Sequence, residues 1–288
     1  MMCENVNLLD SFKIVLVEPQ NPINVGTVIR AMKNMGLKHL TLVHPAEMDL
    51  QKTQISAHRT EDLLQNIQIC DSLDQALQGI HESFGFSARK RTQNWASLDM
   101  EAAVSRSLKL AQMSQKIAFV FGREQSGLNN EELKRCSCLV HIETSDYTSL
   151  NLAQAVLLAS YSLLRQSRMP SAAQSEVPLQ RLDNFAPGTR IATQDERIRL
   201  LKQLENVLVE IGYFKSADPN TAIHRIQNLL NRAELHNDEY HLLMGIVAEV
   251  SNYAKLVERG IQPEKIRPAK SLNDLDPLAD PQNIGKLE

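Results

Sequence analysis

The feature that most constrains the fold is a series of short, continuously apolar runs that each end at a proline, a glycine or a polar residue. The clearest are KIVLVEP and KIAFVFG, at residues 13–19 and 116–122. A run without alternating polar residues predicts a strand buried on both faces, as in parallel sheets that carry helices on either side. The runs that we interpret as strands are 13–19, 39–45, 83–87, 116–122 and 138–142.

Segments with helical spacing alternate with these strands. In residues 24–34, Val25, Val28 and Met32 recur on one helical face, and Gly36 follows where a C-cap glycine belongs. Further helices are expected at 129–136 and at about 150–166. Strands that alternate with helices predict an α/β domain with a mainly parallel sheet.

The second half of the chain has a different character. Residues 165–180 contain few large apolar side chains and are rich in Ser, Ala, Gln and Pro, which is typical of a linker. Beyond them, Thr193 and Glu196 predict a capping box, the Asp-Pro pair at 218–219 predicts a second helix start, and 242–257 is amphipathic. We therefore expect an α/β domain (1–168), a linker (169–190), a small all-helical domain (191–260) and a disordered tail (261–288).

The net charge of the chain limits how it can bind nucleic acid. A net charge of −3 gives no general attraction, so any surface that binds phosphate has to be local. The densest basic cluster is SARKR at 87–91, with Arg89 and Arg91, and Arg30 and Arg123 are further candidates. A short basic cluster of this kind is more often a solvated loop.

Other cellular classes are not favoured. No run of about 18 apolar residues predicts a membrane span, and the N-terminus lacks the pattern of a signal peptide. The cysteines are scattered and lack the spacing of metal ligands, so we expect reduced thiols, no metal and a cytoplasmic protein. They are Cys3, Cys70, Cys136 and Cys138.

Three segments place polar residues and glycines where strands end, and ligands of open α/β sheets bind at those ends. They are 19–36, 119–128 and 146–160. None contains a G-x-G-x-x-G or a Walker lysine, so the standard dinucleotide and P-loop sites are excluded. Purely structural interpretations of these segments also stay open. Arg30 could be a surface charge, residues 119–128 an ordinary loop with a surface ion pair, and Thr148 or Ser149 a helix N-cap.

Together, NPINVGTVIRAMKNMG (21–36), VFGREQSGL (120–128) and YTSLNLAQAV (147–156) resemble, in order, the three motifs of the SPOUT superfamily of RNA methyltransferases. Within it they are most similar to the TrmH-type 2′-O-ribose methyltransferases, in particular to enzymes that modify nucleotide 32 (C or U) in the tRNA anticodon loop. The resemblance is strong over about 12–166 and looser over 190–258.

This resemblance implies a mostly parallel sheet whose C-terminal part is threaded through a loop as a trefoil knot. Because chains almost never knot, only the resemblance predicts this feature. It also implies a pocket that binds S-adenosylmethionine through backbone contacts. The implied contact residues are Phe86, Ser87, Ala88, Gly122, Ile142, Thr148, Ser149 and Leu150.

The resemblance further implies which residues act on the RNA. Arg30 is the residue assigned to the transfer step, with Glu124, Ser149 and Asn151 as the other catalytic candidates. A guanidinium is not deprotonated in proteins, so we prefer Arg30 as a clamp on phosphate and developing alkoxide rather than as a base. The RNA-binding candidates are Arg30, Arg89, Arg91 and Arg123.

The implied partners are tRNA and a second copy of the chain, since family members form homodimers. His224, Arg225 and Arg232 are candidates for extra tRNA contacts, and a solvated face is an equal alternative for them. Two other functions stay open, namely methylation of ribosomal RNA and RNA binding without catalysis.

Overall fold

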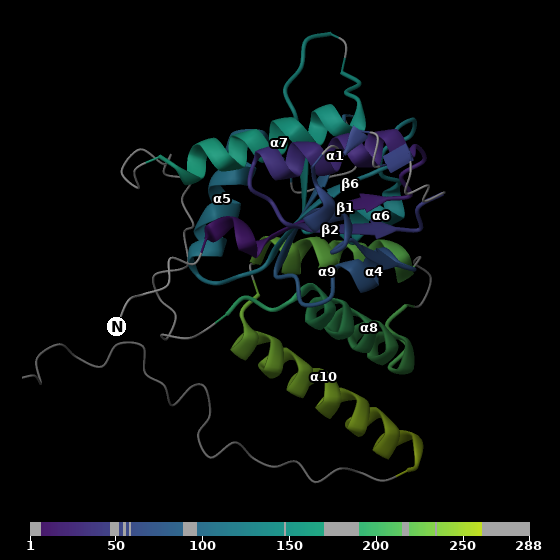
Figure 1. Ribbon diagram of the computed structural model, residues 1–288. Helices are drawn as coiled ribbons and strands as arrows, with labels where there is room; N and C mark the ends of the chain where they lie inside the picture. Colours follow the sequence, from purple (N-terminus) through teal and green to yellow (C-terminus); the bar gives the residue numbers. More distant parts are fainter. Residues whose placement is uncertain are drawn as a thin grey trace, which may run out of the picture.

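The computed structural model describes residues 7–46, 52–53, 56–57, 59–88, 97–146, 148–169, 190–214, 219–233 and 235–260. The predicted tail, most of the predicted linker, and Asp218 of the predicted Asp-Pro helix start lie outside these residues. Figure 1 shows a sheet between two layers of helices, with the C-terminal helices α8, α9 and α10 on the side away from α1 and α7.

The sheet confirms the predicted parallel α/β class. Its strand order is β3-β2-β1-β6-β4-β7-β5, and each neighbouring pair is parallel. The short edge strands β3 and β5 were not predicted. The bounds are β1 Phe12–Val17, β2 His39–Val43, β3 Gln68–Cys70, β4 Glu82–Phe86, β5 Ser97–Asp99, β6 Ile117–Phe121 and β7 Cys138–His141.

Alternate residues of each central strand feed two separate cores. On one face, Ile14 and Phe119 pack beneath α1 (Pro22–Asn34), α5 (Met100–Gln112) and α7 (Leu152–Ser167). On the other face, Val15 and Val120 pack against residues of α4 (Leu73–Ala76) and α6 (Asn130–Lys134). The short elements η1 (Leu8–Ser11) and α3 (Glu61–Leu64) lie on the α1 side. Burial on both faces explains why the strand sequences are continuously apolar.

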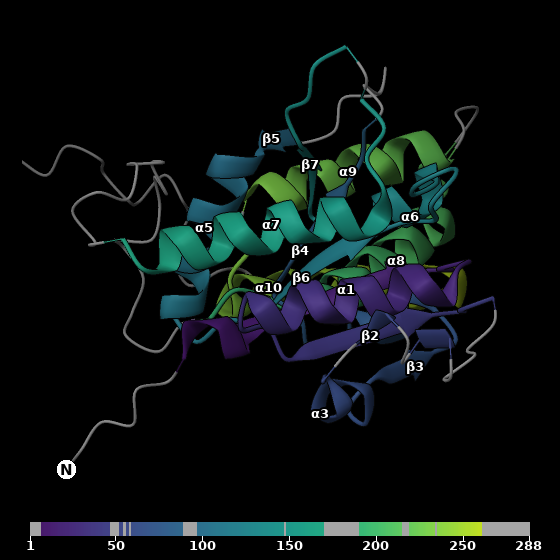
Figure 2. The same ribbon diagram turned by 45° about the horizontal axis from the view of Figure 1, so that its top comes forward.

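Helices α1 and α7 lie side by side and run in the same direction, as Figure 2 shows. Their first turns are joined by a hydrogen bond between Asn24 and Asn151, and a single groove contacts the last turns of both. Two loops that follow strands are therefore held together at one end of the helix pair.

The predicted C-terminal helices are present as α8 (Gln194–Glu210), α9 (Pro219–Ala233) and α10 (Asn237–Glu258), and they share a core of their own. Helix α8 begins with the predicted capping box of Thr193 and Glu196. None of the helices in the described part of the chain is both long and apolar enough to span a membrane.

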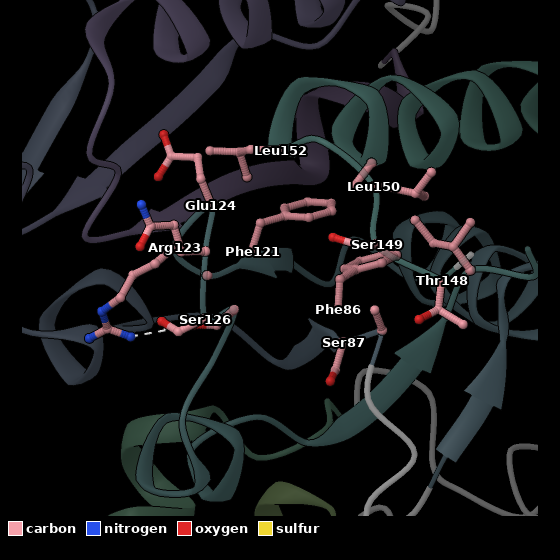
Figure 3. Close-up of a pocket in the computed structure, with 16 residues that line it drawn as sticks. Phe86, Ser87, Phe121, Arg123, Glu124, Ser126, Thr148, Ser149, Leu150 and Leu152 are labelled. Carbon is pink, nitrogen blue, oxygen red and sulfur yellow. Dashed lines mark hydrogen bonds between the residues drawn. The ribbon is translucent and has the colours of Figure 1, made fainter. Parts of the chain in front are cut away.

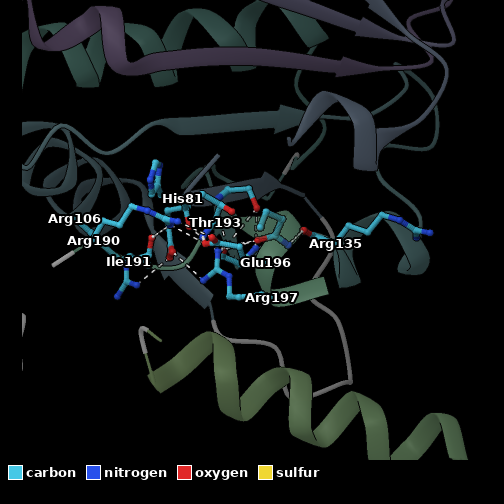
Figure 4. A network of polar contacts seen from close by, with 12 residues as sticks. His81, Arg106, Arg135, Arg190, Ile191, Thr193, Glu196 and Arg197 are labelled. Carbon is cyan, nitrogen blue, oxygen red and sulfur yellow. Dashed lines mark hydrogen bonds and ion pairs between the residues drawn. The ribbon is translucent and has the colours of Figure 1, made fainter. Parts of the chain in front are cut away.

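A buried polar network that the sequence did not predict joins these helices to the sheet (Figure 4). The Arg197 guanidinium of α8 donates to the His81 carbonyl at 2.6 Å and to Ser137 Oγ at 3.1 Å, and lies 3.7 Å from the Glu82 carboxylate. Arg106 binds the same carboxylate at 2.9 Å. Glu82 is the first residue of β4 and Ser137 immediately precedes β7. The network therefore attaches the C-terminal helices near the amino ends of these strands, opposite their carboxyl ends.

Candidate active site

A cavity of about 320 Å³ lies at the carboxyl ends of β4, β6 and β7 (Figure 3). The three segments singled out at strand ends in the sequence do not contribute equally. The loops after β6 and before α7 line the cavity together with the end of β4, whereas the segment after β1 does not. The lining residues include every predicted cofactor contact: Phe86, Ser87, Ala88, Gly122, Ile142, Thr148, Ser149 and Leu150.

Two aromatic rings form one wall of the cavity. Phe86 and Phe121 stack with their centroids 4.4 Å apart and their planes 13° from parallel, and both rings are buried. Above them, Leu150 and Leu152 add an apolar boundary, while Ser87 stands at the rim (Figure 3). The cavity therefore combines an apolar interior with polar groups at its edge, as sites for small organic ligands do.

The turn after β4 is fixed to its neighbour. His141 Nδ1 donates to the Ser87 carbonyl at 2.7 Å, and the Ser87 amide donates to the Val140 carbonyl at 3.1 Å. Because a carbonyl accepts this bond, the hydrogen of the His141 ring sits on Nδ1. These bonds hold the backbone of residues 86–88 open toward the cavity.

Gly122 is required by a close backbone approach. A Cβ at this position would overlap the backbone of Gly127 and Leu128. The loop folds back on itself, with the Gly127 amide donating to the Arg123 carbonyl at 2.9 Å. A glycine here lets the loop close against its own backbone at the cavity.

Arg123 braces this loop. Its guanidinium makes charge-assisted hydrogen bonds to both carboxylate oxygens of Glu132, at 2.8 and 3.1 Å, and one to Glu18 at 2.8 Å. The hydrogen bonds to Glu132 and Glu18 raise the pKa of the Arg123 guanidinium, and the guanidinium in turn lowers the pKa of the Glu18 carboxyl group. The side chain is 16% exposed and points away from the cavity (Figure 3). These bonds show that Arg123 holds the loop in place, while the RNA contact expected from the sequence stays a prediction.

Glu124 ties the loop after β6 to the loop after β1. Its carboxylate accepts hydrogen bonds from the Gln20 amide at 3.0 Å, the Asn21 amide at 3.1 Å and Asn24 Nδ2 at 3.1 Å. Its hydrogen-bond donors in the described part of the chain are therefore two backbone amides and one side-chain amide, and the catalytic role expected from the sequence stays a prediction.

The start of α7 corrects the cap that we left open. Neither Thr148 nor Ser149 is the N-cap, because Asn151 accepts from the Ala153 amide at 2.8 Å and forms a capping box with Gln154. Asn151 is also hydrogen-bonded to Asn24, the first residue of the predicted helix 24–34, for which the sequence suggested no role. Thr148 and Ser149 are exposed and line the cavity, so they are available to a ligand.

The structure describes two of the four arginines predicted to bind RNA, Arg30 and Arg123. Arg30 is exposed on α1 and is not among the residues that line the cavity. Arg89 and Arg91 lie outside the described residues, as does the side chain of Arg232. On α9, Arg225 is exposed, whereas the half-buried His224 lies beside Asn228, and burial, with Lys134 nearby, lowers the pKa of its ring.

Comparison with known families accounts for both parts of the chain. Residues 11–161 match the SpoU rRNA Methylase family, and residues 195–261 match the C-terminal domain of the tRNA methyltransferase TrmJ. The chain belongs to the SpoU methylase family. Among relatives of this methylase, the tRNA (cytidine/uridine-2′-O-)-methyltransferase TrmJ of Photorhabdus laumondii is 36% identical and matches 86% of this chain and 100% of its own. The tRNA (cytidine/uridine/adenosine-2′-O-)-methyltransferase TrmJ of Pseudomonas aeruginosa is 34% identical over 86% and 96% of the two chains.

Solved structures show that the fold of this SpoU methylase is shared. The crystal structure of TrmJ from Z. mobilis ZM4 superposes with a TM-score of 0.68 at 24% identity, covering 83% of this chain and 98% of that one. A probable methylase family protein from Haemophilus influenzae Rd KW20 superposes with a TM-score of 0.51 at 29% identity, over 86% and 99% of the two chains. The predicted SPOUT-type class is thereby confirmed.

Proposed function

We propose that this protein transfers a methyl group from S-adenosylmethionine to a ribose 2′-hydroxyl of tRNA, at nucleotide 32 (C or U) in the anticodon loop. The observation that carries the proposal is the convergence of residues 86–88, 122–127 and 148–150 on one cavity. Two relatives with 34 to 36% identity are tRNA 2′-O-methyltransferases, which supports the same reaction and the same class of substrate for this chain.

The residues around the cavity fit this cofactor. The stacked Phe86 and Phe121 offer an apolar wall, and the absence of a side chain at Gly122 lets the loop of residues 122–128 fold back on its own backbone beside that wall. Residues 86–88, Gly122, Ile142 and 148–150 would hold the molecule, in line with the sequence expectation. When bound, S-adenosylmethionine supplies an electrophilic methyl group.

The protein's own part in the reaction is to position and to stabilise charge. Arg30 is suited to hold the phosphate beside the reacting ribose and the negative charge that develops on its oxygen, because its planar donors match such groups. The proton then passes to phosphate or water, since the Arg30 guanidinium stays charged. Glu124 and Asn151 hold the surrounding loops, and Ser149 is free to donate to the RNA.

A homodimer is part of this proposal. Large apolar side chains on the outer sides of α1 and α7 are exposed, namely Ile23 (52%), Leu157 (38%), Leu158 (41%) and Tyr161 (52%). Neighbouring exposed apolar residues of this size favour burial against another protein surface. Arg30 lies on the same side of α1 as Ile23. This position supports an active site to which the RNA or the second protomer adds the remaining contacts of Arg30.

The family resemblance also supports features that the geometry does not test. We include among them the trefoil knot, a cytoplasmic location, and the division of the chain into residues 1–168, 169–190, 191–260 and 261–288.

The direct test is methyl transfer from radiolabelled S-adenosylmethionine to purified tRNA and, in parallel, to ribosomal RNA, followed by mapping of the modified ribose. Label at nucleotide 32 of tRNA is the expected result. Label only in ribosomal RNA would move the substrate to that class, and unlabelled RNA of both kinds would contradict an enzymatic role.

The assigned role of Arg30 is tested in the same assay. Arg30→Ala should reduce transfer by at least a thousandfold and leave the cofactor dissociation constant within about twofold, because Arg30 does not line the cavity. Lys38→Ala, which removes a surface charge paired with Asp10, is the matched control and should retain activity. Loss of cofactor binding in Arg30→Ala would make Arg30 a structural residue.

A further inference from the structure

Helices α1 and α7, which lie side by side on one face of the sheet, carry only positive charge. Residues 22–34 and 152–168, which cover α1 and α7, contain Arg30, Lys33, Arg165 and Arg168 and neither Asp nor Glu. Each of these cations is exposed. In a chain of net charge −3, this is a local positive surface of the kind that phosphate binding requires.

This surface ends in a groove. Between the last turns of α1 and α7, a cavity of about 580 Å³ is bordered by Lys33, Asn34, Ser167 and Arg168, with Asn7 on its third side. The first turns of the same helices carry Asn24 and Asn151, next to the candidate active site. At about 1.5 Å per residue, the 16 residues of α7 separate the two ends by roughly 24 Å.

The carboxylates near the groove leave part of this charge uncompensated. Lys33 is paired with Asp62 at 2.5 Å, and Lys38 is paired with Asp10 at 2.9 Å. Within the described part of the chain, neither Arg165 nor Arg168 has an ion-pair partner. Cations in the last turn of a helix also interact favourably with the helix dipole. An experiment therefore has to distinguish phosphate binding by these arginines from a purely structural role.

We propose that the groove between the C-terminal ends of α1 and α7 binds the phosphate backbone of tRNA, away from the reacting ribose. This proposal rests on the proposed function, because the groove would contact another part of the same tRNA that reacts at the opposite end of α1 and α7. Arg165 and Arg168 follow Tyr161 by about one and two turns. Arg168 borders the groove and Arg165 lies one turn before it, so the exposed apolar residues and these two cations occupy successive parts of α7. The guanidinium donors bind phosphate and carry no sequence preference, so this contact sets the orientation of the RNA.

The test is the salt dependence of tRNA binding by the full-length double variant Arg165→Gln/Arg168→Gln. Each lost phosphate contact lowers the slope of log K against log salt by about 0.9, so the slope should fall by about 2. The KM for tRNA should rise about tenfold, with kcat within about twofold and cofactor affinity unchanged. The matched control is Arg199→Gln/Lys202→Gln, which removes two exposed cations of α8 and should match wild type.

The outcomes separate the two proposals. If wild type methylates tRNA but the double variant keeps the wild-type slope and KM, the groove is not an RNA contact. If wild type methylates no tRNA yet the double variant still loses slope, the proposed function fails and the groove stands. The variant Arg165→Lys/Arg168→Lys keeps both charges, so it should retain most of the slope. An equal loss of slope in this variant would overturn the phosphate contact in favour of a packing role.

Discussion

Asn151 at the start of α7 donates through Nδ2 to Asn24 Oδ1 on α1 at 3.3 Å, across 127 residues of sequence. Asn24 in turn donates through Nδ2 to the Glu124 carboxylate at 3.1 Å. One side chain therefore connects the segments that follow β1, β6 and β7. Its amide uses an acceptor on one side and a donor on the other, which an isosteric carboxylate cannot reproduce.

We predict that Asn24→Asp impairs the reaction more than it impairs folding. The new carboxylate would face Glu124, and repulsion between like charges would separate the two loops. We expect kcat to fall about 10- to 100-fold and the free energy of unfolding to fall by about 1–2 kcal/mol. Single-turnover transfer and urea unfolding measure the two effects. Thr27→Ala, on the outer side of the same helix, is the control, and an equal loss of kcat there would argue against a specific role for Asn24.

A second prediction separates the helix cap from the ligand site before α7. Asn151→Ala removes the observed N-cap and should lower the free energy of unfolding by about 1 kcal/mol. Ser149→Ala removes an exposed hydroxyl that lines the cavity, so unfolding should change by less than about 0.5 kcal/mol while methyl transfer slows. Thermal denaturation and transfer assays on both variants test this. A destabilised but fully active Ser149→Ala would reverse the assignment.

A third prediction concerns the close approach at Gly122. In Gly122→Ala the methyl group would overlap the backbone of Gly127 and Leu128, so the loop has to move away from the cavity. We expect the affinity for S-adenosylmethionine, measured by calorimetry, to fall at least tenfold. Gly245→Ala is the matched control, because Gly245 lies in α10 with open space around it. That substitution should leave cofactor binding unchanged and alter stability by no more than about 1 kcal/mol. Wild-type affinity in Gly122→Ala would show that the loop tolerates a side chain.

The sheet could be predicted from the sequence because its central strands are buried on both faces and are therefore continuously apolar. The edge strands β3 and β5 have three residues each and are largely exposed, so they carry no such pattern. Helix α5 was also missed, because small residues such as Ala103, Ser107 and Ala111 form much of its buried face. Strand order depends on contacts between distant segments, which no local pattern encodes.

The candidate site was predictable only in part, for a related reason. Similarity of three motifs identified the segments that line the cavity, but the partners of individual side chains depend on the folded chain. For Arg123 the sequence left open an RNA contact or a surface ion pair, and it could not identify the carboxylate partners, because Glu18 and Glu132 lie in other elements. No sequence pattern marked Arg197, although its side chain is 2% exposed and joins the C-terminal helices to the sheet.

The junction between the C-terminal helices and the sheet should be sensitive to acid in two ranges of pH. Burial, with Arg190 and Arg197 nearby, lowers the pKa of His81 from 6.5 to about 4, and its neutral ring accepts a hydrogen bond from the Lys116 amide. A lowered folded-state pKa means that the unfolded chain binds more protons below pH 6.5. The stability that depends on neutral His81 is therefore complete above about pH 6.5 and is lost as the pH falls toward 4.

Glu196 governs the lower range. Its hydrogen bonds with Arg190 lower the pKa of the carboxyl group from 4.5 to about 2, so its contribution is present above about pH 4.5 and is lost as the pH falls toward 2. Urea unfolding of the full chain from pH 8 to pH 3 should show both losses. His81→Asn keeps a hydrogen-bond acceptor for the Lys116 amide, and it should reduce the dependence of the free energy of unfolding on pH between pH 6.5 and 4. We expect an effect of about 1–2 kcal/mol, smaller than the whole pKa shift would give, because solvent screens a partly exposed ring. Glu196→Gln should flatten only the lower range, and a wild-type curve in both variants would exclude these two groups as the source of acid sensitivity.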